Sequence, residues 1–585
     1  MNSHTVLQYA AFLALVTVLV KPLGAYMARV FERQRTVLDP VMSPVERLLY
    51  RITGVDPLDE MDWKRYAYCF ALLGFTGTVA LYAILRVQQF LPGFDAAHMS
   101  TPMTPDLAMN TAISFSTTTT WQAYGGETTM SYFSQLVGLT VQNFLAGASG
   151  LSVGVAFVRG FARQQATKLG NFWVDLVRSL LWILLPLSVV GALLLVSQGV
   201  IMNFRPYTAA APVDSSEVKT IGDQSSTNPA PTMQTIAQGP VAALEIIKNL
   251  GTNGGGFFNV NGAHPFENPT PLSNFLEMLA IMLLPAAFTY TFGRMVKDTR
   301  QGWTLYVVMS LLFMAALLIC GAAEQQVNPD ISRAGVDSQI NGNMEGKEVR
   351  FGVSQSVLTA VVTSNGATGS YNSMHDSYTP LGGTVPLVNM LLGEIVFGGL
   401  GTGLYSIIML ALIGLMLSGL MVGRTPEYLG KKIRPSEAKM ITIYALATPI
   451  AILPLTAIAV VSKAGLAGLT TNNGAHGFTE ILFAFASSMA NNGQNFAGLS
   501  ANSVFYNVST SAAMMIGRFA LAIPALCFAG LYAKQIRQPV TVGAVRTDSI
   551  TFSVVLISTA LIVMGLSFFP ALTLGPILEH LLGFR

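Results

Sequence analysis

Charged residues are scarce in this sequence. Asp, Glu, Lys and Arg together make up 11% of its 585 residues, whereas a soluble domain carries about 25%. Hydrophobic residues account for 51%, and this balance is typical of a polytopic protein surrounded by membrane lipid. The net charge of +3 is too small for a chain of this length to favour nucleic acid as a partner.

Cysteines and catalytic motifs are also scarce. Cys69, Cys320 and Cys527 are scattered in apolar stretches without CxxC spacing, so we interpret them as small core residues rather than metal or redox ligands. There is no GxxxxGK(S/T) loop and no DKTG-type aspartate, and we therefore do not expect the chain to hydrolyse ATP by itself. His264 and His375 lack HxxxH or HxxEH spacing, and we expect them to form hydrogen bonds rather than to hold a metal ion.

Long apolar runs, by contrast, recur along the whole chain. A membrane-spanning helix needs about 20 predominantly apolar residues. The first run holds Lys21 and leads into basic residues, which fits an uncleaved spanning helix better than a cleaved signal peptide. The sequence predicts an all-α polytopic membrane protein with ten transmembrane helices, near 6–30, 67–91, 131–158, 174–202, 275–295, 303–322, 386–422, 440–461, 510–533 and 550–570.

The distribution of basic residues predicts the orientation of these spans. Most of the 33 Lys and Arg residues lie in the connections that follow the odd-numbered spans. Short connections enriched in basic residues face the cytoplasm, so we expect both termini to be extracytoplasmic. The even-numbered connections are long and rich in Ser, Thr, Asn, Gly and Pro, and segments such as 215–231 and 328–350 are typical of exposed loops.

Four of the even-numbered connections share a further pattern. Each contains an apolar run too short to cross a membrane, at 107–116, 239–250, 353–363 and 478–490, and a polar or glycine-containing turn follows each run directly. The chain can be described as span, short helix, polar turn and span, four times over, with one extra span at each end. The central triplets of the four polar turns are Thr118, Thr119 and Thr120; Thr252, Asn253 and Gly254; Ala367, Thr368 and Gly369; and Asn491, Asn492 and Gly493.

These turns predict a cation-selective pore. Non-helical backbone at membrane depth is tolerated only where it is buried in protein or lines a watery path, and converging carbonyl, hydroxyl and amide oxygens can replace the hydration shell of a cation. Glycine permits the positive φ that turns successive carbonyls inward, and the C-terminal ends of the short helices favour a cation. No triplet contains a carboxylate, which favours a monovalent ion over calcium or magnesium. The alternative is that the turns are ordinary surface loops, but four on one side favour a pore.

Several of these segments closely resemble the KdpA family, the potassium-binding subunits of Kdp potassium-transporting ATPases. The resemblance runs nearly end to end and is carried by "TNGGGFFNVNGAHPFENPT", "MHDSYTPLGG", "GEIVFGGLGTGLY" and "NNGQNFAGLSAN". It implies a pseudo-fourfold pore like that of the potassium transporter superfamily, a potassium ion as ligand with no organic cofactor, and a bacterial plasma (inner) membrane location. It also implies a complex with a KdpB-like P-type ATPase subunit and with KdpC-like and KdpF-like subunits. ATP hydrolysis in the partner would drive import of potassium that enters through the filter.

Two of the polar turns depart from the family pattern. The first reads TTTTWQ where the family typically has TNTNWQ, and the third has Ala367, Thr368 and Gly369 where a Ser-Cys-Gly form is familiar. Threonine keeps a hydroxyl acceptor, so we expect cation binding to survive. Potassium selectivity and affinity are the properties on which these substitutions bear. Around the triplets we expect Gln122, Gly255 and Gly256 to form the surround of the filter.

The seventh span is unusually long and is interrupted by a glycine cluster at 398–403. A dinucleotide-binding reading fails because no strand precedes the cluster. A flexible break and an intramembrane loop that gates the path both remain open, and the family resemblance favours the gate, formed by Gly398, Gly399, Gly401, Thr402 and Gly403. Charges at membrane depth are costly and usually functional, so Glu394 and Arg518 are candidate functional residues, and the resemblance implies that they belong to the gate and to the path from the filter to the tunnel. A purely structural ion pair between them is the alternative.

These patterns divide the chain into six parts. They are a first span with its cytoplasmic loop (1–65), four pore repeats (66–170, 171–301, 302–437 and 438–540) and a last span (541–585). The favoured function is that of a non-catalytic potassium-selecting subunit of an ATP-driven importer. A self-sufficient channel or ion-gradient-driven transporter is one alternative. A membrane scaffold with purely structural turns is another.

Overall fold

The computed structural model describes residues 3–212, 233–335, 342–421, 423, 425–539 and 546–583, together with two short strands at 218–219 and 227–228. The loop expected at 215–231 lies almost wholly outside this part of the chain. Within the described residues, ten helices are long and apolar enough to cross a membrane, which confirms the number of spans predicted from the sequence. They are α1 (Ser3–Phe31), α3 with η1 (Trp63–Phe90), η3 with α6 (Ser134–Ala162), α7 with η4 and α8 (Phe172–Ser197), α10 (Pro271–Met295), α11 (Thr299–Glu324), α15 (Thr402–Met421), α16 (Pro435–Val461), α19 (Val504–Ala533) and α20 (Ile550–Leu574).

The seventh span differs from its predicted form. The sequence suggested a run over 386–422, but α14 (Pro380–Leu391) ends before a non-helical stretch at 392–401, and only α15 is long enough to span. We call this stretch the 392–401 loop. Left-handed backbone at Gly393, Glu394, Phe397 and Gly401 is incompatible with a continuous helix. The predicted break at 398–403 therefore begins earlier than expected, and Thr402 and Gly403 already belong to α15.

Four short helices occupy the positions predicted for the sub-spanning runs. They are α4 (Pro105–Ser116), α9 (Val241–Leu250), α13 (Gly352–Asn365) and α18 (Gly474–Met489). The polar turns follow their C-terminal ends. α4 begins at an N-cap: the Thr104 hydroxyl accepts a hydrogen bond from the Leu107 amide and Pro105 starts the helix, a combination that favours initiation there. All four short helices pack against spanning helices, for example α4 against α3 and α19, and α18 against α16 and α19.

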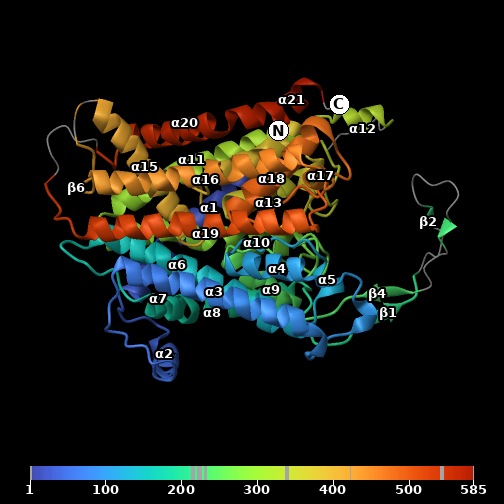
Figure 1. Ribbon diagram of the computed structural model, residues 1–585, viewed down its shortest axis with the longest axis horizontal. Helices are drawn as coiled ribbons and strands as arrows, with labels where there is room; N and C mark the ends of the chain where they lie inside the picture. The colour runs from blue at the N-terminus through green and yellow to red at the C-terminus, as the bar shows by residue number, and fades with distance from the viewer. Residues whose placement is uncertain are drawn as a thin grey trace.

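The remaining elements are short and lie at the ends of the bundle. Both chain termini lie at one end, together with the paired strands β1 and β4, whereas β5 and β6 lie at the other end (Figure 1). These elements are α2 (Asp39–Thr53), η2 (Ala96–His98), α5 (Gly126–Thr129), β1 (Thr208–Ala210), β2 (Val218–Lys219), β3 (Thr227–Asn228), β4 (Gln234–Ile236), α12 (Pro329–Arg333), η5 (His375–Ser377), β5 (Glu427–Tyr428), β6 (Lys431–Lys432), α17 (Lys463–Leu466) and α21 (Pro576–Leu581).

The spanning helices form an inner and an outer set. In the most apolar part of α6 and α10, 83% and 78% of residues are buried in the protein, whereas in α1 and α16 the share is 22%. Because lipid is as apolar as the protein interior, the outer helices can expose large apolar side chains such as Val18 and Ile450 without the cost they would carry in water. The inner helices instead surround the polar turns, so the burial pattern places the polar centre of the fold away from lipid.

A buried ion pair ties the loop before α13 to the end of α11. Lys347 Nζ lies 2.7 Å from Glu324 Oε2, and both side chains are fully buried. The other oxygen of Glu324 accepts hydrogen bonds from the Thr379 amide and hydroxyl, at 2.8 and 2.7 Å. Glu324 therefore joins α11, the Lys347 loop and the start of α14 on the side where the short helices begin.

We expect Lys347→Met to destabilise the protein by about 3–5 kcal/mol, because it leaves the Glu324 charge buried and unpaired. Thermal unfolding of the purified protein in detergent measures this effect. The double variant Lys347→Met, Glu324→Gln is the control, since it removes both charges and should recover most of the lost stability. Equal melting temperatures for the wild type and the single variant would show that the pair contributes nothing.

Candidate functional site

The four polar turns converge although they are far apart in the sequence. The glycine or threonine at the third position of each triplet makes the closest approaches. A Cβ on Gly254 would lie 2.7 Å from Thr120 Oγ1 and 2.8 Å from the N and Cα of Gly369, and a Cβ on Gly369 would lie 2.9 Å from the Gly493 carbonyl carbon. Real Cβ atoms essentially never come so close, so the turns can meet in this way only if Gly254 and Gly369 have no side chains.

The backbone conformation repeats from turn to turn. The first residue of every triplet has positive φ: 68° at Thr118, 48° at Thr252, 51° at Ala367 and 52° at Asn491. Positive φ is uncommon for residues other than glycine and costs free energy that the surrounding structure must offset. The same unusual conformation at four equivalent positions indicates one shared architecture rather than four unrelated loops.

This pattern narrows one expectation from the sequence. Gly254, Gly369 and Gly493 were expected to supply positive φ or close approach of the backbone, but only Gly493 has positive φ, at 88°. Gly254 and Gly369 are instead required by close approach. Thr, Ala and Asn occupy the left-handed positions. Of these three residue types, only Asn adopts left-handed backbone readily.

Hydrogen bonds to another segment fix the second residue of three of the triplets, and in the third triplet the Thr368 hydroxyl donates to the Gly366 carbonyl of its own turn at 2.9 Å. The Asn253 amide donates to the Asn143 carbonyl in α6 at 2.7 Å, and the Asn492 amide donates to the carbonyls of Thr363 and Ser364 in α13 at 3.1 and 3.2 Å. The Thr119 hydroxyl accepts a hydrogen bond from the Asn491 amide at 2.8 Å. Since these side chains bond to other segments, they brace the turns.

The predicted surround residues connect neighbouring turns. Gln122 Nε2 donates to the Gly256 carbonyl at 3.1 Å, which links the first turn to the second. Gly255 has φ of 78°, and the Gly256 amide donates to Asn261 Oδ1. The structure therefore brings Gln122, Gly255 and Gly256 together beside the triplets.

The two histidines form the hydrogen bonds expected of them. Burial, with a smaller effect from the Lys347 charge, lowers the pKa of His375 to about 3. Its neutral ring can therefore accept a hydrogen bond at Nδ1 from the side-chain amide of Gln494, 2.8 Å away and next to Gly493. His264 stacks on Phe258, with ring centroids 3.8 Å apart, and its Nδ1 accepts from the Phe266 amide.

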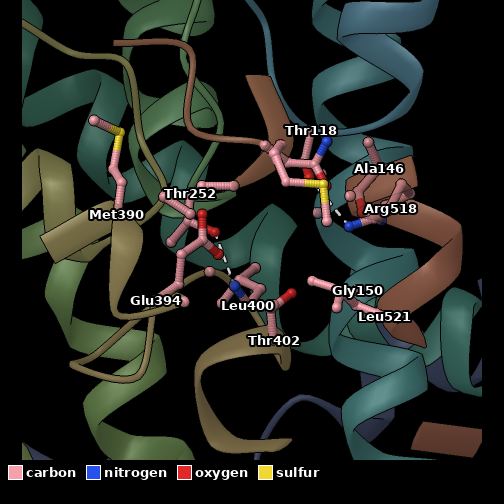
Figure 2. A pocket seen from close by; sticks show the side chains of 18 of the residues that line it. Thr118, Ala146, Gly150, Thr252, Met390, Glu394, Leu400, Thr402, Arg518 and Leu521 are labelled. Atoms are coloured by element: carbon pink, nitrogen blue, oxygen red, sulfur yellow. Dashed lines mark hydrogen bonds between the residues drawn. The ribbon is translucent and has the colours of Figure 1, made fainter. Parts of the chain in front are cut away.

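A narrow cavity of about 30 Å³ lies beside the converged turns. This is room for about two water-sized occupants. The first residue of every triplet lines it, so all four turns face the same space. Figure 2 shows Thr118 and Thr252 on its upper side, and Glu394, Leu400 and Thr402 below them.

The 392–401 loop closes the cavity opposite the polar turns. The Leu400 amide donates to Thr252 Oγ1 at 2.9 Å, so the loop is bonded directly to the second turn. Glycines of α6 let it sit close, since a Cβ on Gly150 would lie 2.6 Å from the Leu400 carbonyl oxygen and one on Gly154 would lie 2.7 Å from Gly401 Cα. Gly399 and Thr402 also line the cavity, whereas Gly398, Gly401 and Gly403 do not.

Glu394 and Arg518 lie on opposite sides of this cavity (Figure 2). Arg518 donates to Thr118 Oγ1 at 3.1 Å and to the Ala146 carbonyl and Ser149 hydroxyl at 2.8 Å. Glu394 is 4% exposed, and its Oε1 has no hydrogen-bond partner among the described residues. No ion pair joins Glu394 to Arg518 directly, although the Arg518 charge acts on the Glu394 carboxyl across the cavity. A buried carboxylate oxygen without a hydrogen-bond partner in a cavity is a candidate cation ligand.

Sequence reasoning missed a group of buried charges behind the second polar turn. Lys248 Nζ lies 2.8 Å from Glu245 Oε2 in α9, and both side chains are fully buried. Glu267 accepts hydrogen bonds from the amides of Phe258 and Gly262 at 3.0 and 2.6 Å, which orders the chain after the turn. The signal was present in the sequence: Glu245 and Lys248 are three residues apart in an otherwise apolar short helix, and charges there are rarely accidental.

Comparisons with known proteins address the identity of the fold. The model of the family described as "Potassium-transporting ATPase A subunit", KdpA, matches residues 10–581. The potassium-transporting ATPase potassium-binding subunit of Methylorubrum extorquens is 50% identical over 577 residues, covering 99% of this chain and 97% of that protein. The proteins of the same name from Koribacter versatilis and Sorangium cellulosum are 48% and 50% identical, and the alignments cover 99% of each chain.

The relatives match this chain over almost its whole length at about 50% identity. The similarity therefore extends over nearly the whole fold. The matched residues 10–581 hold the four short helices, the four polar turns and all or most of each of the ten spans described above. The match agrees with the resemblance found in the sequence motifs. This multi-pass membrane protein therefore belongs to the KdpA family, the A subunits of potassium-transporting ATPases.

Proposed function

We propose that this chain binds extracytoplasmic potassium in a filter formed by the four polar turns and passes it to a P-type ATPase partner for ATP-driven import. The relatives named above are potassium-binding subunits, and potassium is the ligand we assign here, without an organic cofactor. The observation that carries the proposal is the fourfold repetition of positive φ at Thr118, Thr252, Ala367 and Asn491, which all line one cavity. Oxygen-lined backbone of this kind can replace the hydration shell of a monovalent cation.

The filter takes its cation from the extracytoplasmic side. The two termini lie at the end of the bundle where α17 and α21 are found, and the basic β5–β6 segment lies at the opposite end (Figure 1). Basic connections face the cytoplasm, so this arrangement supports extracytoplasmic termini. In a bacterium the corresponding location is the plasma (inner) membrane.

The cation then leaves sideways. A second cavity, of about 70 Å³, lies between α15, α16 and α20 and is lined by Ser406, Tyr444 and Phe568, among others. Gly393, Thr448 and Leu521 line both cavities, so the two spaces adjoin. The 392–401 loop blocks the straight path from the filter to the cytoplasm. Without such a block, potassium accumulated by pumping would leak back through the filter. The lateral cavity gives the cation its route toward the ATPase partner.

Energy for transport comes from that partner. The sequence has no ATP-binding loop and no phosphorylatable aspartate motif, and we propose that a KdpB-like P-type ATPase subunit hydrolyses ATP. KdpC-like and KdpF-like subunits would complete the assembly. The chain itself is then a non-catalytic subunit that selects and delivers the ion.

The function can be tested on the complex purified with its own partners. We expect potassium, and not sodium, to stimulate ATP hydrolysis, and we expect potassium uptake into vesicles to require ATP. The isolated chain should bind potassium in a calorimetric titration without hydrolysing ATP. ATP-independent potassium flux through the intact chain would instead favour a self-sufficient channel, and the absence of any cation-specific binding would favour a scaffold.

We expect Glu394→Gln to lower the maximal rate of ATP-driven potassium uptake by at least about tenfold, with little change in the potassium concentration at half-maximal rate. A carboxylate and a cation 4 Å apart attract each other by about 4 kcal/mol at an effective dielectric constant of 20. The variant would lose this attraction for a potassium ion that has just left the filter. Uptake by reconstituted complexes at varied potassium measures both quantities. The matched control is Glu348→Gln, since Glu348 is 45% exposed. An unchanged maximal rate would remove Glu394 from the path.

A further inference from the structure

A cluster of one histidine and three carboxylates lies outside the polar turns and the cavities described above. His476 and Glu480 are four residues apart on α18 and so share one face of that helix. Asp376 lies in η5 and Glu579 lies in α21. Three segments separated by about a hundred residues each thus contribute ionisable side chains to one place.

The imidazole of His476 is held at the centre of the cluster. Its Nδ1 lies 2.8 Å from Glu579 Oε1, and its Nε2 lies 3.0 Å from Asp376 Oδ1 and 3.9 Å from Glu480 Oε1. One potential ligand atom from each of Asp376, His476 and Glu480 lies within 4.8 Å of the other two. In a tetrahedral zinc site with bonds of about 2.1 Å, neighbouring ligand atoms are about 3.4 Å apart, so small side-chain rotations bring these three atoms to that geometry.

The three carboxylates of the cluster outnumber its one side chain that can carry a positive charge, His476. Three carboxylates surround a single imidazole, and among the described residues none of the three forms an ion pair with Lys or Arg. Glu480 is fully buried. Its Oε1 accepts a hydrogen bond from the Asn472 amide at 3.0 Å, but its Oε2 has no hydrogen-bond partner in the part of the chain that the structure describes. A buried carboxylate oxygen without a partner is costly, and a bound cation would remove that cost.

We propose that Asp376, His476 Nε2 and Glu480 bind a divalent transition-metal ion of the zinc class. A mixed imidazole and carboxylate set suits zinc and its neighbours, whereas calcium and magnesium prefer sites made of oxygen alone. The hydrogen bond from Nδ1 to Glu579 matches the arrangement in which a second carboxylate orients a metal-bound histidine and fixes its tautomer. Metal binding would displace the proton that Nε2 shares with Asp376, and the fourth position would be open to water.

The site joins elements that surround the proposed filter. Asp376 follows His375, which bonds to Gln494 beside Gly493, and His476 and Glu480 lie on the short helix that leads to Asn491. A metal ion would therefore fix the segments next to the third and fourth polar turns relative to each other. Through Glu579 it would also fix the position of α21. This coupling to the filter depends on the proposed function, whereas metal binding itself does not.

Cobalt(II) provides a direct test, because it occupies zinc sites and its visible absorption reports the coordination geometry. We expect the full chain, in its purified complex and freed of metal with a chelator, to bind one cobalt ion with a four-coordinate spectrum that zinc displaces. Glu480→Gln should weaken binding at least about tenfold, since even outer partners of a metal ligand change affinity 10- to 100-fold. His476→Gln should abolish the spectrum.

The matched control is His98→Gln, which removes a histidine that pairs with a carboxylate, Asp95, elsewhere on the protein and should leave cobalt binding unchanged. Asp376→Asn tests the same site if His476→Gln fails to assemble. A metal-free complex that shows no four-coordinate cobalt spectrum, or ligand variants that bind cobalt as tightly as the wild type, would overturn the proposal. Potassium-stimulated ATP hydrolysis, measured in parallel in chelator, reports separately on the proposed function.

Discussion

Replacing Gly254 with Asp is expected to lower potassium affinity by about 10- to 100-fold and to abolish discrimination against sodium and rubidium. The Cβ of any residue here would lie 2.7 Å from Thr120 Oγ1 and 2.8 Å from the Gly369 backbone, and overpacking of this kind costs about 1–3 kcal/mol. The added carboxylate would also attract cations by charge, which does not distinguish potassium from sodium. Calorimetric titration with each ion, and uptake of each ion by the reconstituted complex, measure the two effects.

Two alanine variants separate the effect of volume from the effect of charge. Gly254→Ala adds only the Cβ, so it should lower affinity while retaining more selectivity than the aspartate. Gly565→Ala in α20 is the matched control, because a Cβ there would meet nothing within 4 Å. If Gly254→Asp discriminated among the three ions as the wild type does, the second polar turn would not be part of the filter.

Deleting 399–402 is expected to convert the proposed pump subunit into a leak. The deletion removes Leu400, whose amide bonds to Thr252 Oγ1, and shortens the loop that closes the cavity against α6. Potassium that crosses the filter would then reach the cytoplasm without passing through the partner. We expect ATP-independent potassium flux to appear in vesicles, and net ATP-driven uptake to be lost.

The variant Leu400→Ala provides a milder comparison. It keeps the backbone hydrogen bond to Thr252 and the length of the loop, so any leak should be much smaller than that of the deletion. Assembly of each variant with the ATPase partner can be checked by copurification. An assembled deletion variant that pumps normally and shows no flux without ATP would place the barrier elsewhere.

The repeating plan of the molecule could be predicted from local patterns. The ten spans follow from apolar length, which lipid imposes on any helix that crosses it. The four short helices follow from apolar runs too short to cross, such as 239–250, each ending at a polar turn. These features depend on residues that are close together in the sequence, so they are visible without a structure. Membership of the KdpA family could also be recognised from the sequence, because the motifs that carry the resemblance are contiguous.

The interruption of the seventh span could be predicted only in part. Glycines at 398–403 marked the break, but the 392–401 loop begins earlier, where Gly393, Glu394 and Phe397 adopt left-handed backbone. A glutamate and a phenylalanine give no local signal for that conformation. Contacts with α6 and with Thr252 hold the loop in place, and those contacts involve residues more than a hundred positions away.

By itself the sequence determined which segments cross the membrane, which dip and turn, and which chemistry the chain lacks. Only the tertiary structure decided that Thr, Ala and Asn carry the positive φ at the equivalent positions of the four turns, that Glu394 and Arg518 face each other across a cavity without pairing, and that Asp376, His476 and Glu579 meet. The physical reason is the range of the forces involved. Hydrophobic length and turn preference act over a few residues, whereas close approach and charge act between segments that only packing brings together.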